Sequence, residues 1–183
     1  AFDATAARIR SIAAVHHLLA GERGGMVASD RLLKTVVEAL AAPGEEVVVV
    51  SDELRLEAAR AQQLGVIANE LIANALRHGR APVTVVLASG DDGAVRLEVR
   101  DGGRTGVGAT GAGGGAAGGA APGTAGATPG TPRANGASSG LGLTLVRQIA
   151  ERGLHGDFDL STQPDGTTSA VLRFNVGDAD PDR

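Results

Sequence analysis

The run from Ala58 to His78 has two stripes of side chains at helical spacing, one apolar and one polar. The apolar stripe consists of residues three or four apart, namely Leu64, Ala68, Leu71 and Ala75. The polar stripe is Glu70, Asn74 and Arg77, which lie nearly above one another if the run is helical. The run therefore predicts a long amphipathic helix with a row of functional groups beside its apolar face.

The polar stripe allows two interpretations. A carboxylate, an amide oxygen and a guanidinium on one face can hold a magnesium ion and a polyphosphate. For an isolated Glu-x-x-x-Asn pair, a solvated helix face is the more common explanation. Three later features of the chain favour the ligand site: an Asp-Gly-Gly after a predicted strand, a Gly-x-Gly before a predicted helix and a Gly-Thr-Thr before a last strand.

The N-terminal region predicts two helices. In residues 3–20, the side expected to be buried carries Ile9, Ile12, Ala13, His16 and Leu19. Ser29 or Asp30 is expected to cap a second helix, which Pro43-Gly44 follows. The apolar stripe of that second helix consists of Leu33, Val36, Val37 and Leu40.

Short apolar or alternating runs predict strands. Residues 46–50 are expected to form a buried strand. Residues 83–88 and 95–100 are expected to form a hairpin around a Gly-Asp-Asp-Gly turn. In the second strand of this hairpin, alternation places Glu98 on a solvated face.

The C-terminal part adds a helix over residues 141–152 and a hairpin of residues 158–161 and 168–174. Together these elements predict one domain of the α/β class, a two-layer sandwich of helices on a mixed, mostly antiparallel sheet. No segment has a repeat at a fixed period.

Four motifs in a fixed order resemble those of a known ATP-binding fold. They are NELIANALRHG, VRDGG, SSGLGLTLVRQIAE and GTT. The order resembles the Bergerat-type fold shared by histidine kinases, gyrase, the Hsp90 chaperone and mismatch-repair ATPases, and it is most similar to the catalytic domain of sensor histidine kinases. The resemblance covers nearly the whole chain and implies binding of ATP and Mg²⁺.

The resemblance assigns adenine recognition to Asp101. A carboxylate accepts a hydrogen bond from the exocyclic amine of adenine, but it would face the carbonyl oxygen of guanine. Gly102 and Gly103 would let the backbone approach the base; alone, Asp-Gly-Gly is equally well explained as a strand-end turn. The family pattern D-x-G-x-G is broken here, because Thr105 stands at its fifth position.

The resemblance also assigns the phosphate end of the site. Asn74 is the expected magnesium ligand, and Glu70 the expected catalytic residue, orienting the waters of the metal or assisting the attacking imidazole. Arg77 and His78 match family positions that are often lysine and aromatic, and Arg77 is expected to contact phosphate.

The second glycine motif predicts a phosphate site where a helix begins. Gly140 and Gly142 surround Leu141, and the free N–H groups of a helix start attract anions. Ser139, with Ser138 before it, is expected to cap this helix or bind phosphate oxygens. The family's threonine near adenine corresponds to Thr168, with Thr167 as the alternative.

The segment RIRSIAAVHHLL resembles the end of the second dimerisation helix in histidine kinases near the HWE group. His16 and His17 occupy positions that do not accept phosphate in that subclass, so the acceptor is expected upstream of Ala1. Residues 1–42 are thus expected to be a dimerisation and connecting remnant, residues 43–176 the catalytic domain and residues 177–183 a disordered tail.

Residues 104–138 stand where the family has its ATP lid. Their composition of glycine, alanine, threonine and proline, with only Arg104 and Arg133 charged, predicts disorder. A low-complexity expansion with no part in lid closure is the alternative explanation.

Composition excludes other classes. A net charge of −4 gives no support to nucleic-acid binding, and the chain has neither cysteine nor an apolar run that could span a membrane. The sequence therefore predicts a cytoplasmic, ATP-dependent histidine kinase domain, homodimeric in the intact kinase, with a response regulator receiver domain as partner. The alternatives are a serine kinase of the anti-sigma-factor type and a degenerate nucleotide-binding module without catalysis.

Overall fold

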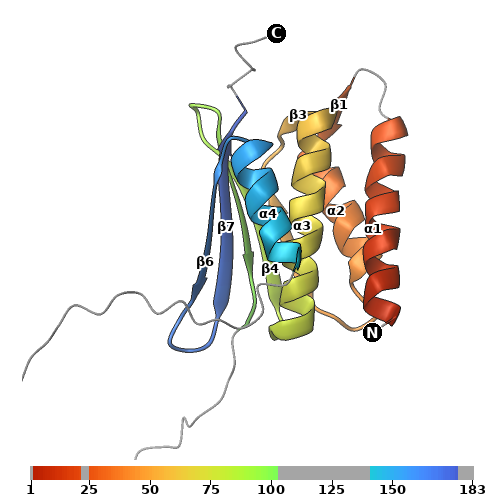
Figure 1. Ribbon diagram of the computed structural model, residues 1–183, viewed down its shortest axis with the longest axis vertical. Coiled ribbons are helices and arrows are strands. Elements are labelled where there is room, and N and C mark those ends of the chain that lie inside the picture. Colours follow the sequence, from red (N-terminus) through yellow and green to blue (C-terminus); the bar gives the residue numbers. More distant parts are fainter. Residues whose placement is uncertain (1, 22–24, 103–140, 177–183) are drawn as a thin grey trace, which may run out of the picture.

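The computed structural model describes residues 2–21, 25–102 and 141–176 of the 183-residue chain. Helices α2 (Ser29–Leu40), α3 (Ala58–His78) and α4 (Leu141–Arg152) form a layer on one side of a five-stranded sheet, and α1 (Phe2–Gly21) packs against α2 and α3 (Figure 1). This arrangement confirms the predicted two-layer α/β class. None of the helices in the described ranges is long and apolar enough to cross a membrane.

The large sheet is mixed, as predicted. Its strand order is β2 (Val47–Ser51), β4 (Val83–Ser89), β5 (Ala94–Arg100), β7 (Thr168–Asn175) and β6 (Asp157–Thr162). Among the strands of the described residues, only the β2–β4 pairing is parallel. Both predicted hairpin turns are confirmed, with Gly93 at φ 78° and Gly166 at φ 84°, backbone conformations that glycine adopts at little cost.

The main core lies between α3 and the sheet. Leu64 and Ala68 of the predicted apolar stripe are fully buried and Leu71 nearly so, while Ala75 is half-buried near the end of the helix. They face aliphatic side chains of the central strands, such as Val85, Leu97 and Leu172. The stripe thus fixes which side of α3 faces the sheet, and with it where the polar stripe lies.

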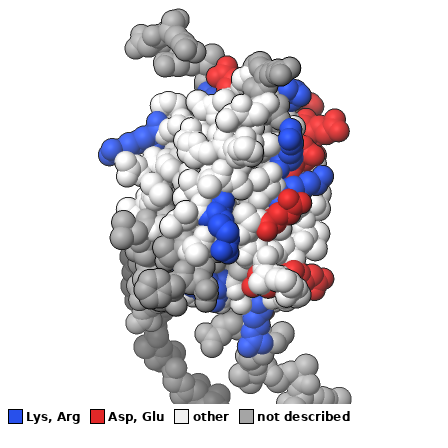
Figure 2. Space-filling model, turned by 90° about the vertical axis from the view of Figure 1, so that its right-hand side faces the viewer, with Lys and Arg blue, Asp and Glu red and all other residues white. Residues whose placement is uncertain are grey.

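The predicted buried side of α1 is wrong except at Leu19, which is half-buried against the core. Ile9 is 64% exposed and Ile12 40% exposed, and Ala13 and His16 are also exposed. The inward side consists of Ser11, Val15 and Leu18. Apolar residues lie around most of this helix, so spacing alone does not select a side; contact with α2 and α3 does. Figure 2 shows the α1 side of the molecule, where uncharged atoms separate scattered charged side chains.

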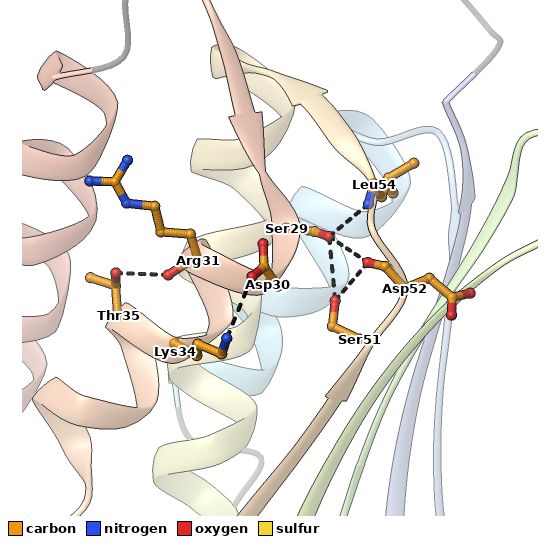
Figure 3. A network of polar contacts seen from close by, with 8 residues as sticks. All are labelled: Ser29, Asp30, Arg31, Lys34, Thr35, Ser51, Asp52 and Leu54. Carbon is orange, nitrogen blue, oxygen red and sulfur yellow. Dashed lines mark hydrogen bonds and ion pairs between the residues drawn. The ribbon is translucent and has the colours of Figure 1, made fainter.

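The predicted cap of α2 is also wrong. Ser29 is the first residue of the helix, and neither side chain of the Ser29-Asp30 pair caps it. The Ser29 hydroxyl instead donates to the Asp52 carbonyl (3.0 Å) and accepts from the Leu54 N–H (3.2 Å), as Figure 3 shows. These bonds tie α2 to the connection between β2 and β3 (Arg55–Glu57), which pairs with β1 (Met26–Ala28). This two-stranded pair was missed by sequence analysis because each strand has only three residues.

Residues 46–50 contribute an edge strand rather than the predicted buried one. In β2, Val48 is 43% exposed and Val50 55% exposed. In the part of the chain that the structure describes, this strand has a partner on one side only, and helices cover one face of the sheet (Figure 1). A run of four valines favours a strand, but it does not show that both faces are covered.

Glu98 is buried, contrary to the predicted solvated face. Its carboxylate accepts hydrogen bonds from Ser169 (2.7 Å) and Arg100 (2.7 Å) and forms an ion pair with Arg96 (2.8 Å). Burial alone would raise the pKa of Glu98, but the hydrogen bonds from Ser169, Arg100 and Arg96 and the charge of Arg96 lower it to about 2. Neighbouring strands therefore supply the polar partners that allow this carboxylate to be buried.

We expect Glu98→Gln to lower stability at pH 7 by about 1–3 kcal/mol, because the two arginines lose their shared anionic acceptor. A pKa lowered to about 2 gives a stabilisation that is complete above about pH 4.5 and is lost as the pH falls toward 2. Denaturation at pH 7 and pH 3 should therefore show a smaller pH dependence for the variant. The exposed Glu38→Gln is the control, and an unchanged pH dependence for Glu98→Gln would contradict the assignment.

Candidate functional site

The polar stripe of α3 runs from the core to the surface. Glu70 is only 4% exposed, Asn74 is half-buried, and Arg77 and His78 in the last turn are exposed. The exposure of these side chains thus increases toward the C-terminal end of the helix, where the helix leaves the packed interior. The predicted metal ligand and phosphate-contacting residues are therefore open to a ligand at one end of the helix, while Glu70 lies deeper.

Asp101 and Thr168 are brought together at the end of two neighbouring strands. The Asp101 N–H donates to the Thr168 carbonyl (3.1 Å), and the Thr168 N–H donates to Asp101 Oδ1 (3.0 Å). Because of these two bonds, the position of the Asp101 carboxylate is fixed. The residue is also buried, with 7% of its surface exposed. Thr167 belongs to the turn, where its N–H donates to Asp165 Oδ1 (2.9 Å).

Gly79 brings the end of α3 against Asp101. A Cβ atom at Gly79 would contact Asp101 Cβ and lie 2.5 Å from Oδ2, so only glycine fits there without a shift. The Gly102 N–H donates to the Arg80 carbonyl (2.7 Å), which ties the same two segments together. This role of Gly79 was not predicted from the sequence, although a glycine directly after the polar stripe is a signal for a helix end.

Gly102 has a packing role that the sequence did not predict. A Cβ atom at this position would lie 2.5 Å from the Ala81 carbonyl oxygen, so the absent side chain permits contact between two backbone segments. Gly102 is therefore needed for packing between these segments. The approach of a base to its backbone stays a prediction.

The start of α4 lies at the same end of the molecule as the last turn of α3 and the β6–β7 turn (Figure 1). Leu141 and Gly142 begin this helix, as predicted, and α4 packs against α3. Gly103, Ser139 and Gly140, together with the predicted lid at 104–138 and the tail at 177–183, lie outside the described residues.

Asn69 is a buried polar residue that sequence analysis did not select. It is 1% exposed, and its Nδ2 donates to Glu70 Oε1 at 3.3 Å. Its neighbour Glu70 is therefore held by a side chain from the same helix. Asn69 lies one helical turn after Gly65, on the side of α3 that faces α1. The spacing of these two residues was the signal in the sequence that could have indicated Asn69.

Comparison with solved structures shows the fold of histidine kinase catalytic domains. The blue-light activated histidine kinase EL346 of Erythrobacter litoralis is 16% identical with a TM-score of 0.66, covering 96% of this chain; this chain spans 55% of that protein. The histidine kinase domain of EL346 is 17% identical with a TM-score of 0.64, and the shares covered are 96% and 76%. The histidine kinase domain of the Escherichia coli osmosensor EnvZ is 17% identical with a TM-score of 0.54, and the shares covered are 87% and 94%.

Sequence comparison gives a family but no individual relative. No curated protein matches the chain. The family model described as histidine kinase-, DNA gyrase B- and HSP90-like ATPase matches residues 59–178, which include the polar stripe, Asp101 and Thr168. The chain therefore belongs to the histidine kinase-, DNA gyrase B- and HSP90-like ATPase family, as its motifs predicted.

Proposed function

We propose that the chain is the ATP-binding catalytic domain of a two-component sensor histidine kinase. It transfers the γ-phosphoryl group of ATP to a histidine on a dimerisation helix, for relay to the receiver domain of a response regulator. The observation that carries this proposal is the placement of Asp101, which the Thr168 backbone holds beside Gly79 at the end of α3. The carboxylate to which we assign the reading of the base thus lies beside the end of α3, the helix that carries the polar stripe, in a domain of this family.

Asp101 is suited to select adenine. A carboxylate has about four acceptor positions, so the bond that Oδ1 accepts from Thr168 leaves capacity for the exocyclic amine of a base. Guanine would present a carbonyl oxygen at the same place, and two facing acceptors cost about 1–3 kcal/mol. We therefore assign adenine recognition to Asp101, with Thr168 as its positioning residue.

The residues of the polar stripe fit a magnesium–triphosphate. Asn74 offers a neutral amide oxygen at a half-buried position, and Arg77 and His78 extend toward solvent, where phosphate oxygens would lie. When bound, Mg²⁺ neutralises phosphate charge and takes most of its ligands from phosphate and water. Arg77 adds a fixed positive charge to this end of the site.

We assign to Glu70 the action on the attacking group. Its carboxylate is buried and accepts a hydrogen bond from Asn69, so it is held in one orientation. In the transfer, an imidazole nitrogen forms a bond to the γ-phosphorus, the bond from that phosphorus to the β–γ bridging oxygen breaks, and ADP leaves. We propose that Glu70 orients the imidazole and accepts its proton.

The exposed side of α1 fits homodimerisation in the intact kinase. Ile9 and Ile12 are large apolar residues open to solvent, and residues 11–21 carry no Lys, Arg, Asp or Glu. A helix of this kind is stabilised when a second helix covers it. This supports the resemblance of the segment to a dimerisation helix.

We expect Asn74→Ala to remove the magnesium-dependent part of ATP binding. Calorimetric titration with Mg²⁺ should show an affinity about tenfold lower or more, because one ligand of the metal is lost, while titration in a chelator should be unchanged. Gln62→Ala, which removes an exposed amide from the same helix, is the matched control.

Two outcomes would redirect the proposal. If the folded wild-type chain binds no ATP, the active-kinase function is wrong. If it binds Mg-ATP but transfers no phosphoryl group to a supplied acceptor helix, it is a nucleotide-binding module without catalysis.

A further inference from the structure

One buried polar side chain of α1 and one of α3 lie at the contact between these two helices. Ser11 is fully buried and Asn69 is 1% exposed, and both line the same cavity of about 10 Å³ between these helices. Neither Ser11 Oγ nor Asn69 Oδ1 has a hydrogen-bond partner among the described residues. Two unsatisfied groups of this kind, each costing about 1–3 kcal/mol, are uncommon in one small region.

The orientation of the Asn69 amide follows from its other contact. A carboxylate oxygen accepts hydrogen bonds, so the amide nitrogen must be the group that faces Glu70 Oε1, at 3.3 Å. The amide oxygen is therefore the atom of Asn69 that is left without a partner, on a residue that lines the cavity. This oxygen needs a donor. The other polar residues that line the cavity are Ser11, His16 and Gln62; of these, only Ser11 is buried and has a group without a partner, so its hydroxyl is the donor that a bridging water molecule would connect.

The packing of the two helices supports a fixed geometry. A Cβ atom at Gly65, one turn before Asn69, would lie 3.0 Å from Val15 Cγ1. Gly65 therefore lets α1 approach α3 closely next to the cavity. A cavity of about 10 Å³ has the lower limiting size for one water molecule, and such a molecule needs at least two polar partners.

We propose that one water molecule in this cavity accepts a hydrogen bond from Ser11 Oγ and donates one to Asn69 Oδ1, and that Asn69 in turn holds Glu70 in its catalytic orientation. Asn69 and Ser11 are thus positioning residues for the phosphoryl transfer. This inference rests on the proposed function, because it takes Glu70 as the group that acts on the imidazole. It also makes the orientation of Glu70 depend on where α1 lies.

The proposal predicts a specific pattern in a double-mutant cycle. Ser11→Ala should lower kcat for phosphoryl transfer to a supplied acceptor helix by roughly threefold to tenfold, with KM for ATP unchanged, as expected for one lost hydrogen bond. Asn69→Leu, which has a similar volume but no polar group, should lower kcat further. In the Asn69→Leu background, Ser11→Ala should have no additional effect, because Ser11 acts only through Asn69. His17→Ala, on the exposed side of the same helix, is the control.

A second measurement needs no activity. The ¹⁵N and ¹H resonances of the Asn69 side-chain amide should move in Ser11→Ala and stay in place in His17→Ala. Unchanged Asn69 resonances in Ser11→Ala would overturn the water link, and equal losses of kcat in both backgrounds would overturn the positioning role. A wild-type chain that binds no ATP would defeat the proposed function and with it the catalytic role of this link, while the resonance measurement would still decide whether the link exists.

Discussion

Asp101→Asn is expected to lower ATP affinity about tenfold to a hundredfold and to narrow the preference for ATP over GTP. The reason is the bond from the Thr168 N–H to Oδ1. An asparagine has a single side-chain oxygen, and keeping that bond directs its NH₂ group to where the base would lie. Two donors then face each other with adenine, whereas the carbonyl oxygen of guanine becomes an acceptable partner. A mismatch of about 1–3 kcal/mol corresponds to this change in affinity.

Calorimetric titration of both nucleotides in the presence of Mg²⁺ tests this expectation. The variant should fold with nearly unchanged stability, because the Thr168 N–H keeps its acceptor. Asp91→Asn, in the β4–β5 turn at the other end of β5, is the matched control and should leave both affinities unchanged. Equal losses for ATP and GTP would show that Asp101 acts on something other than the exocyclic group of the base.

Gly79→Ala is expected to reduce both stability and ATP binding. The new Cβ atom would lie 2.5 Å from Asp101 Oδ2 and 2.6 Å from the Ala75 carbonyl oxygen, so either the end of α3 or the carboxylate must move. Such overpacking costs about 1–3 kcal/mol, and movement of Asp101 would also displace the group assigned to the base. Thermal denaturation and ATP titration should therefore change together.

Gly21→Ala is the matched control, because a Cβ atom at Gly21 would meet nothing within 4 Å. It should leave ATP binding unchanged and should not lower the thermal midpoint. If Gly79→Ala lowers the midpoint and leaves ATP affinity intact, Gly79 serves only the packing of α3. If it changes neither quantity, the close approach of α3 to Asp101 has no energetic importance.

Long periodic segments were predictable from the sequence. The bounds of α3 and α4 agree with the prediction, because each has an apolar side that only one register can bury. Both hairpins were also predictable, since Gly-Asp-Asp-Gly and Pro-Asp-Gly carry strong turn signals. The family followed from the order of the motifs, which the family model confirms over residues 59–178.

Contacts between distant segments were not predictable in the same way. The inward side of α1 depends on α2 and α3, and the burial of Glu98 depends on Ser169, a partner 71 residues away. The Ser29 hydroxyl bonds the β2–β3 connection instead of its own helix, because the β1–β3 pair brings that backbone within reach. In each of these cases the residue type is compatible with both a buried and an exposed position or with more than one bonding partner. The contact that decides between them comes from a segment distant in the sequence.

The sequence by itself determined the family, the α/β class and the residues that carry the polar stripe, because helical spacing and motif order are local properties. Only the tertiary structure decided which groups hold those residues in place. The Thr168 backbone fixes Asp101, and Gly79 sets the distance between α3 and Asp101. The physical reason is that a buried polar group needs a partner at hydrogen-bond distance, and that distance is set by the packing of helices and strands far apart in the chain.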